Sequence, residues 1–430
     1  MTGAKLALAG VLAALPLLGG CEVGPDFLRP AAPAATGYTP APLPEKTASA
    51  NVPAGEAQRF VADLDIPGQW WTLFHSEPLS ALIAEALTAN PSLAAAEAAL
   101  RQAKENVYAQ QGSLFPAVSA NGSAAREKIS GASLGSRTSS AILGITTASL
   151  DLSYAVDVFG GLRRQGEALE AQEDYQRFQL EAAYLSLTAN LVVAAVTEAA
   201  LRGEIAASED IIKIESDQLL VLRHQLELGG IAKSDVLQQE AILAQARASL
   251  PPLQKQLAQE RNQLSALAGR FPSDETAAKF DLASLTLPQD LPLSLPSKLV
   301  EQRPDVRAAE AQLHAASANI GVATANQLPQ FAITGQVGST SLGFDKLFSS
   351  GTGIWSIGGS VAQKIFDGGT LLHQKRAAVA AYDQAAAQYR STVITAFQNV
   401  ADALRALQSD ADAVKAQSEA ERSAADSLEL

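Results

Sequence analysis

Cysteine is nearly absent from this chain, and histidine is scarce. Cys21 is the only cysteine among 430 residues, so no disulfide can form within the chain and a multi-cysteine metal site is excluded. The four histidines lie far apart: His75, His224, His314 and His373. Neither HExxH nor CxxC occurs, and the glycine pairs at 160–161 and 368–369 are not in a phosphate-binding frame. The sequence therefore predicts no enzyme, no catalytic residue, no cofactor and no metal site.

A net positive charge and long apolar runs are also lacking. The formal net charge is −13, which excludes a nucleic-acid surface because an acidic chain repels phosphate. After the N-terminal leader no uninterrupted run of 18 apolar residues occurs, so we expect no transmembrane helix. Aromatic residues make up 5% of the chain against 47% hydrophobic residues, many of them alanine. Such a composition predicts slender, closely packed helices rather than one thick core.

What is present begins with an export signal. Lys5 precedes an apolar run from Leu6 to Leu18, and two small residues follow. This order of charged, apolar and small residues is typical of a signal peptide, here residues 1–20, and the run is too short to span a bilayer. We therefore expect the leader to be removed.

The leader ends in Leu18-Gly19-Gly20-Cys21, which resembles the lipobox of bacterial lipoproteins. The resemblance implies that Cys21 becomes the N-terminus and carries fatty acyl chains, such as palmitate, that anchor the protein in a membrane. Glu22 follows the cysteine. Because an aspartate there is the usual mark for retention in the inner membrane, its absence favours the outer membrane.

One unit occurs twice in the sequence. A shift of 213 residues aligns NPSLAAAEAALRQAKENV, from Asn90, with RPDVRAAEAQLHAASANI, from Arg303. A shift of 207 residues then aligns Phe159 with Phe366. The change of shift falls between two strand-like runs, where loop length varies freely. The predicted segments are an extended Pro/Ala-rich tether at 21–66, a first repeat at 67–270, a linker at 271–302 and a second repeat at 303–430.

Each repeat opens with a helix and continues with two strands. Asn90 can cap the first helix, and Pro91 suits its first turn. β-Hairpins are predicted at 117–159 and 330–366, with loops near 126–147 and 341–353. In SLDLSYAVDVF apolar and polar residues alternate, which fits a membrane β-barrel and equally an antiparallel sheet on a soluble core.

Long helices follow the strands. No proline interrupts 160–228, which corresponds to roughly 100 Å of helix at about 1.5 Å per residue. Leu228-Gly229-Gly230 ends this helix, Ser234-Asp235 can cap a return helix, and the tip of the helical hairpin is placed at 228–235. Pro251 and Pro252 predict a kink or short break in the return helix. In the second repeat a long helix begins at 369.

Four stretches carry a family resemblance. They are CEVGPDF, WWTLFHSEPLSALIAEALTANPSL, SYAVDVFGGLRRQGEA and IFDGG. Together they resemble the outer-membrane factors of tripartite efflux pumps, the TolC-like family, in its OprM/NodT lipoprotein branch. The resemblance covers nearly the whole chain.

The resemblance implies a mainly α fold with β, assembled as a homotrimer. Each chain would give four strands to a twelve-stranded β-barrel in the outer membrane and its long helices to a periplasmic α-barrel. Residues 69–89 and 271–300 would form an equatorial belt. The function implied is passive conduction of small molecules, handed over by a periplasmic adaptor (membrane fusion) protein from an inner-membrane transporter of the RND type.

The hairpin tip is the adaptor-docking surface by the same resemblance. The residues in matching places are Gly229, Gly230, Ala232, Ser234 and Asp235. The alternative is that these residues only form and cap a tight turn.

The second repeat is shorter than the first. Leu430 corresponds to Arg223 at the shift of 207 residues, so nothing matches 224–268. We expect a chain truncated at its C-terminus, and we assign no gating carboxylates.

Two alternatives to the efflux channel remain open. One is an outer-membrane channel for type I protein secretion. The other is a lipid-anchored periplasmic coiled-coil scaffold, which would not need strands of membrane length.

Overall fold

A computed structural model describes residues 22–35, 37–42, 44–64, 66–130, 140–274, 278–293 and 296–429. The contacts divide the chain into two units. The first comprises the described residues up to Ala31 together with Leu100–Arg177 and Ala308–Thr392. The second comprises Ala32–Ala99, Phe178–Arg307 and the described residues from Val393 onwards.

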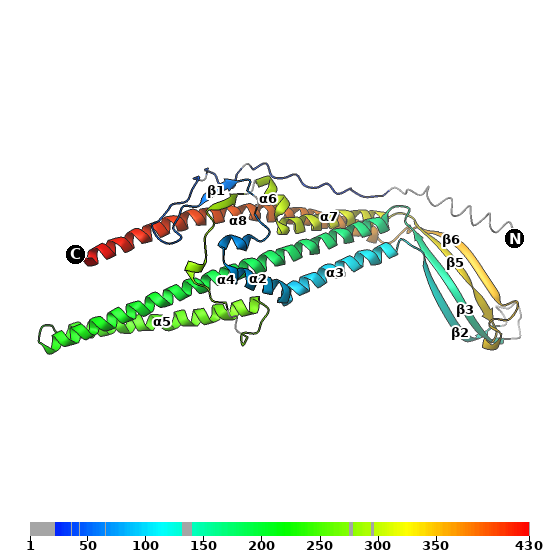
Figure 1. Cartoon of the computed structure of the whole chain (residues 1–430). Coiled ribbons are helices and arrows are strands. Elements are labelled where there is room, and N and C mark those ends of the chain that lie inside the picture. Colours follow the sequence, from blue (N-terminus) through cyan, green and yellow to red (C-terminus); the bar gives the residue numbers. More distant parts are fainter. Residues whose placement is uncertain are drawn as a thin grey trace. The chain divides into compact units, whose positions relative to one another are not determined.

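The first unit contains a four-stranded antiparallel sheet in the order β2-β3-β5-β6 (Figure 1). Its strands are β2 (Ala117–Ile129), β3 (Ala141–Val156), β5 (Gln330–Ser341) and β6 (Gly353–Ala362). The β2–β3 register is unbroken from Ala117↔Ser153 to Ile129↔Ala141. Side chains therefore alternate strictly between the two faces along β2.

The strands reach further than the sequence predicted. A loop was expected near 126–147, but β2 extends to Ile129 and β3 begins at Ala141. The charged run Arg126-Glu127-Lys128 resembles a loop, yet the hydrogen bonds of a β-ladder come from the backbone and tolerate charged side chains on an exposed face. Residues 131–139 of the predicted loop lie outside the described residues. The loop predicted at 341–353 contains the 3₁₀ turn η5 (Phe344–Lys346).

The two repeats are visible in the order of elements. Helix α3 (Pro91–Gly112) leads into β2 and β3, and α7 (Pro304–Ala325) leads into β5 and β6. The starts of α3 and α7, and those of β2 and β5, are separated by the shift of 213 residues that aligns the sequence. The long helices α4 (Gly161–Glu227) and α8 (Thr370–Glu429) follow the second strand of each repeat.

In the second unit, the C-terminal part of α4 forms a helical hairpin with α5 (Lys233–Leu267; Figure 1). Leu219 of α4 and Val236 and Leu243 of α5 are buried between the two helices. Of the kink or short break predicted at Pro251-Pro252, the break was wrong, because α5 runs through both prolines; the kink stays a prediction. The residues four positions earlier, Arg247 and Ala248, are exposed, so water can bind the carbonyls that lose a partner.

The core of the second unit surrounds the middle of α4. Helix α2 (Glu77–Ala89) and the turn η2 (Trp70–Phe74) contribute Leu79, Ile83 and Trp71, and α4 and α5 contribute Leu191 and Leu264. Glu198 is fully buried there, and its Oε1 atom accepts hydrogen bonds from Arg202 and Arg261, each at 2.7 Å. Burial and the neighbouring Glu198 raise the pKa of Glu260.

The tether expected at 21–66 is not wholly extended. Strand β1 (Arg59–Ala62) pairs in parallel with β4 (Asp290–Leu293) in the predicted linker. Arg59 Nε also donates to Asp290 Oδ1 at 3.0 Å. The sequence did not reveal β1 because four residues are too few for a periodic pattern, and its partner lies 231 residues further on. The linker also contains η4 (Leu282–Ser284) and α6 (Pro296–Gln302).

We expected no helix that could cross a membrane, but α4 contains a stretch that is long and apolar enough. It contains an 18-residue window with mean hydropathy 1.5, enough by length and composition to cross a membrane, and 33% of that window is buried. Polar residues interrupt the helix, so counting uninterrupted apolar runs missed it. Leu187, Leu191 and Ala195 of α4 are buried in the core of the second unit. By length and composition, the same stretch also fits a helix that packs in a protein core.

Candidate functional site

One face of the four-stranded sheet carries a polar network. Asp151 of β3 accepts hydrogen bonds from Asn121 of β2 at 2.7 Å, from Ser149 at 2.8 Å and from Gln336 of β5 at 2.8 Å. Further along this face the hydroxyls of Thr147 and Thr340 lie 3.1 Å apart. Side chains from three strands thus hold one carboxylate on this face, where its negative charge adds to the local field.

The opposite face is apolar and uncovered. Leu150, Val337 and Trp355 lie opposite one another across β3, β5 and β6. Their side chains are 51%, 57% and 78% exposed. Large apolar residues gathered on one exposed face indicate apolar surroundings, because a contiguous patch in water is unfavourable. The alternation predicted in SLDLSYAVDVF therefore separates a hydrogen-bonded polar face from an exposed apolar face.

Both outer strands of the sheet are edges. Among the described residues, β2 pairs only with β3, and β6 pairs only with β5. The two edges are long, with 13 residues in β2 and 10 residues in β6. Unpaired backbone groups along such edges invite pairing with another chain, and in hydrocarbon they require it.

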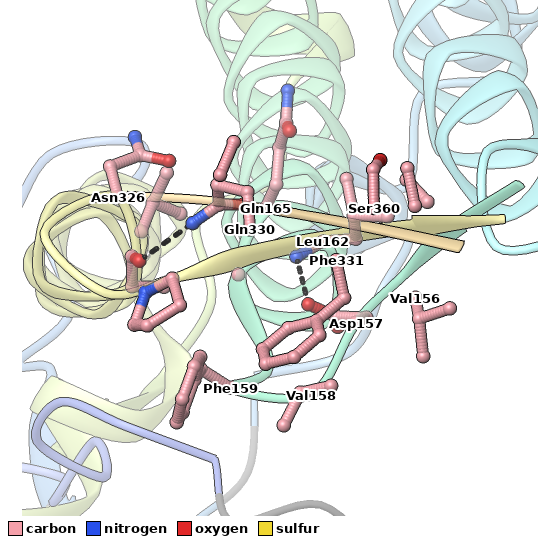
Figure 2. Close-up of a pocket in the computed structure, with 17 residues that line it drawn as sticks. Val156, Asp157, Val158, Phe159, Leu162, Gln165, Asn326, Gln330, Phe331 and Ser360 are labelled. Atoms are coloured by element: carbon pink, nitrogen blue, oxygen red, sulfur yellow. Dashed lines mark hydrogen bonds between the residues drawn. The ribbon is translucent and has the colours of Figure 1, made fainter. Parts of the chain in front are cut away.

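A cavity of about 300 Å³ lies where the strands of the first unit meet its helices (Figure 2). Its polar side chains are engaged with the backbone: Asp157 accepts from the N–H groups of Leu162 and Arg163, both at 3.0 Å. Gln330 donates to the Ala325 carbonyl at 3.1 Å. Figure 2 shows Asp157 beside the start of α4, and the ring centroids of Phe159 and Phe331 are 6.3 Å apart. These hydrogen bonds cap the start of α4 and stabilise the turns that connect strands to helices. The polar residues of the cavity therefore have a structural role.

The segment after Cys21 is held against the first unit by Arg164 of α4. We call residues 22–29 the N-terminal latch. The guanidinium of Arg164 is 4% exposed and contacts Asp26 at 2.7 Å, Glu167 at 2.7 Å and Glu22 at 3.4 Å. Burial alone would lower the pKa of Arg164, but hydrogen bonds to Asp26 and Glu167 raise it above its usual value. The cation therefore stays charged at any physiological pH.

Close packing supports the N-terminal latch. A Cβ atom on Gly24, which has φ +99°, would lie 2.4 Å from the Gly321 Cα atom, so only glycine fits there. The ring of Phe27 stacks on His314 at 4.3 Å, and His314 Nε2 lies 2.8 Å from Glu167 Oε1. The Val23 N–H donates to the Phe159 carbonyl at 3.1 Å, in the turn between β3 and α4. Cys21 lies outside the described residues.

The turn at the hairpin tip is built by its first glycine. Gly229 has φ +75°, and its N–H donates to the Leu226 carbonyl at 3.0 Å. The Gly230 N–H donates to the Gln225 carbonyl at 2.8 Å. This pair of bonds is the Schellman ending of a helix, which favours glycine at the left-handed position. The turn-forming alternative thus accounts for Gly229.

The start of α5 differs from the predicted cap. Ala232, rather than Ser234 or Asp235, occupies the N-cap position. Asp235 lies three residues later, and its carboxylate accepts from the Ala232 N–H at 3.1 Å. Asp235 therefore closes the turn from inside the helix, as the second half of a capping box does. All five predicted docking residues are exposed.

The histidines are dispersed in the structure as in the sequence. His75 ends η2 with φ +50°, His224 is exposed beside Glu227, and His314 belongs to the contacts of the N-terminal latch. Within the described ranges, no three His, Cys, Asp or Glu side chains come close enough to hold a metal ion.

A family model described as "Outer membrane efflux protein" matches residues 82–270 and 295–430. The chain belongs to the outer membrane efflux protein family. The family comprises transport proteins rather than enzymes, and membership confirms the resemblance to TolC-like outer-membrane factors and the mainly α fold with two repeats.

This outer membrane efflux protein has relatives with described roles. It is 31% identical over 403 residues to the probable efflux pump outer membrane protein TtgC of Pseudomonas putida, across 93% of this chain and 80% of TtgC. It is 27% identical to the cation efflux system protein CusC of Escherichia coli, across 93% of this chain and 83% of CusC.

Solved structures agree with the sequence matches. The open-state MtrE outer membrane channel of Neisseria gonorrhoeae is similar with a TM-score of 0.79 and 28% identity, across 95% of this chain and 87% of that chain. The outer-membrane channel OprN is similar with a TM-score of 0.79 and 26% identity, across 93% of this chain and 94% of that chain.

Sequence reasoning missed the partners of Arg164 and Asp151 in this outer membrane efflux protein. Nothing near Arg164 in the sequence indicates that its partners lie about 140 residues earlier, at Val23 and Asp26. The only signal was the GPDF motif itself, whose glycine, aspartate and phenylalanine all make contacts of the N-terminal latch.

Proposed function

We propose that three copies of this chain form a passive exit channel of a tripartite efflux system in the outer membrane. The observation that carries this proposal is a sheet with a polar face, an exposed apolar face and two long open edges. Pairing β2 of one copy with β6 of the next would close twelve strands into a barrel without edges, the form in which strands can cross a bilayer. The polar face would line the pore, and the apolar face would meet lipid.

The segments of the chain receive roles in the same proposal. Residues 67–270 and 303–430 are the two repeats, whose long helices form the periplasmic tunnel. Residues 271–302, together with those from 69 to 89, form an equatorial belt around it. The hairpins at 117–159 and 330–366 supply the membrane strands.

The efflux system would supply two further components, a periplasmic adaptor and an inner-membrane transporter of the RND type. Relatives are named for toluene, antibiotic, solvent and cation efflux. Small toxic molecules are therefore the proposed substrates. A channel for type I protein secretion is the alternative within the same architecture.

The adaptor is proposed to dock on the hairpin tip. Ser234 tests this without disturbing the turn, because it is exposed and, within the part of the chain that the structure describes, its hydroxyl bonds only to Asp235, at 3.4 Å. Ser234→Arg should weaken capture of the adaptor from a crosslinked membrane while the channel stays folded. Gln245→Arg, at an exposed position further along α5, is the control. Equal capture by the Ser234 variant and the natural chain would contradict docking at the tip.

A lipid anchor on Cys21 is proposed as well. The N-terminal latch supports it, because Glu22 packs against Gly160 and Val23 bonds to Phe159, both in the turn between β3 and α4. Acyl chains on the preceding residue would then enter the leaflet beside the barrel. Cys21→Ser should abolish incorporation of labelled palmitate; retained label would contradict the anchor.

The channel itself is tested by mass and conductance. The protein extracted in detergent should have the mass of three chains and should conduct ions in a planar bilayer. A chain lacking residues 117–158 should do neither. Outer-membrane insertion that survived this deletion would favour the periplasmic scaffold, and export of a protein but no small toxic molecule would favour the secretion channel.

A further inference from the structure

Two cations lie on the apolar face of the sheet, at its end away from the helices. The unbroken β2–β3 register places Arg126 opposite Gly144 and Lys128 opposite Ile142. Alternation along β2 puts both cations on the face of Val118 and Ala120, whereas Glu127 points to the polar face. Both cations are exposed, and neither has a hydrogen-bond or ion-pair partner among the described residues.

Their position along β2 matches the border of a membrane. Val118 and Arg126 are separated by about 26 Å of strand at roughly 3.3 Å per residue. At a tilt of about 40°, this length spans about 20 Å of bilayer, close to the height of the apolar band of a membrane barrel. Long cationic side chains there extend to the headgroup level.

An apolar groove of about 650 Å³ lies on the same face, nearer to the helices than the two cations. Its floor consists of small residues, Ala120, Gly122 and Ala148, and Leu150, Val337 and Phe348 line it as well. Phe348 comes from the loop between β5 and β6, which is tied down by hydrogen bonds from Ser339 to Leu347 and Thr352. Along β2, Gly122 precedes Arg126 by only about 13 Å.

We propose that this groove and the two cations form a binding site for an anionic, phosphate-bearing lipid of the outer leaflet. The acyl chain lies in the groove, and the phosphate lies between Arg126 and Lys128. The site rests on the proposed function, which places this end of the sheet in the outer leaflet.

Charge and shape together select this occupant. Guanidinium and ammonium groups bind phosphate oxygens, and two of them favour a lipid with a doubly charged phosphate over a zwitterionic one. A soluble phosphate would satisfy the cations but leave the groove empty. An amphiphile with a phosphate headgroup fits both parts of the site.

The test uses the full chain reconstituted in vesicles of equal parts phosphatidylcholine and phosphatidic acid. The protein is released in mild detergent, and the retained lipids are counted by native mass spectrometry. The natural chain should retain phosphatidic acid in preference to phosphatidylcholine by roughly fivefold for each cation, or about 25-fold. Added inorganic phosphate should not displace the lipid.

Two variants separate the headgroup from the groove. The double change Arg126→Gln and Lys128→Gln should reduce the preference to about one, while Arg247→Gln with Lys255→Gln, two exposed cations on α5, should leave it unchanged. Gly122→Leu should lower the number of retained lipids, because its side chain enters the groove and a Cβ atom there meets nothing within 4 Å. Gly359→Leu is the matched control on β6, where a Cβ atom is equally unobstructed.

A natural chain that conducts in planar bilayers but shows no preference for phosphatidic acid would overturn the lipid site and leave the channel intact. An unchanged preference in the Arg126/Lys128 variant, or displacement of the lipid by inorganic phosphate, would also overturn it. A chain that neither inserts nor conducts would overturn the channel and the lipid site together.

Discussion

Arg164 determines how the N-terminal latch is held, because its buried guanidinium contacts three carboxylates and the Val23 carbonyl. Asp26 and Glu22 are 89% and 37% exposed, so solvent weakens each individual pair. The attraction between Arg164 and Glu167, on the buried side of the cluster, is less screened by solvent. Two glycines, Gly24 and Gly269, are also difficult to replace. Each has a positive φ and lies against the backbone of another segment, so an added Cβ atom would cause strain.

Arg164→Ala should release the N-terminal latch. Removing the cation takes away the ion-pair partner of Glu167 Oε2, while Oε1 keeps its contact with His314 Nε2, and should cost about 1–3 kcal/mol of local stability. Hydrogen exchange of the Val23 amide, which bonds to Phe159, should accelerate accordingly. Arg223→Ala, which removes an exposed ion pair with Glu240, is the control and should leave that amide unchanged. Undiminished protection of Val23 would show that the latch does not depend on Arg164.

Gly269→Ala should destabilise the second unit by about 2–4 kcal/mol. Gly269 ends α5 with φ +79°, and an added Cβ atom would lie 2.5 Å from the Ala89 carbonyl oxygen. Gly112→Ala, where a Cβ atom meets nothing within 4 Å, should cost little. Denaturant unfolding followed by circular dichroism compares the two variants, and equal midpoints would contradict the prediction.

At the scale of elements, the starts of α3 and α5 show when a helix cap can be predicted from neighbouring residues. The cap predicted for α3 is confirmed: Asn90 Oδ1 accepts from the Ser92 N–H at 2.8 Å. The cap predicted for α5 was wrong by two residues, because Asp235 reaches back from inside the helix. Both arrangements satisfy N–H groups at a helix start, and sequence alone does not distinguish a carboxylate before the helix from one within its first turn.

The start of α8 should depend on pH. N–H groups of Leu371, Gly369 and Thr370, together with Lys364, hold the pKa of Asp367 below its usual value, although burial opposes this. Because the folded-state pKa is lowered, the stabilisation is complete above the carboxyl's unfolded pKa, about 3.9, and is lost as pH falls through the lower folded value. Protection of the amides in the first turn of α8, measured against the intrinsic exchange rate at each pH, should therefore fall below about pH 4.

Asp367→Asn is the matched variant for this pH dependence. The amide keeps one acceptor oxygen but cannot titrate, so the protection factors in the first turn of α8 should vary less with pH than in the natural chain. An identical pH profile in both proteins would show that Asp367 is not the responsible group.

At the scale of the whole molecule, the net charge of −13 and the carboxylate of Asp151 on the polar face act in the same direction. In the proposed channel, acidic groups facing the pore attract cations through their summed field. Salt screens that field over about 10 Å at 0.1 M, so the effect is greatest at low ionic strength.

The reconstituted channel should prefer cations, and the preference should fall as salt rises. Asp151→Asn should weaken the preference, whereas Asp290→Asn, which removes a charge from the small β1–β4 sheet, should not. Reversal potentials across a salt gradient measure the preference for cations in each protein. An anion preference at low salt would contradict the prediction.

The sequence by itself determined the duplication, the helical stretches and the two-faced strands, because each depends on periodicity or on residues only a few positions apart. The tertiary structure alone decided the pairing of β1 with β4 and the contacts of the N-terminal latch, whose partners are 231 and about 140 residues apart. It also decided the burial of Glu198 between two arginines and the convergence of three strands on Asp151. Such contacts join side chains that no local pattern connects, so they exist only once the chain has folded.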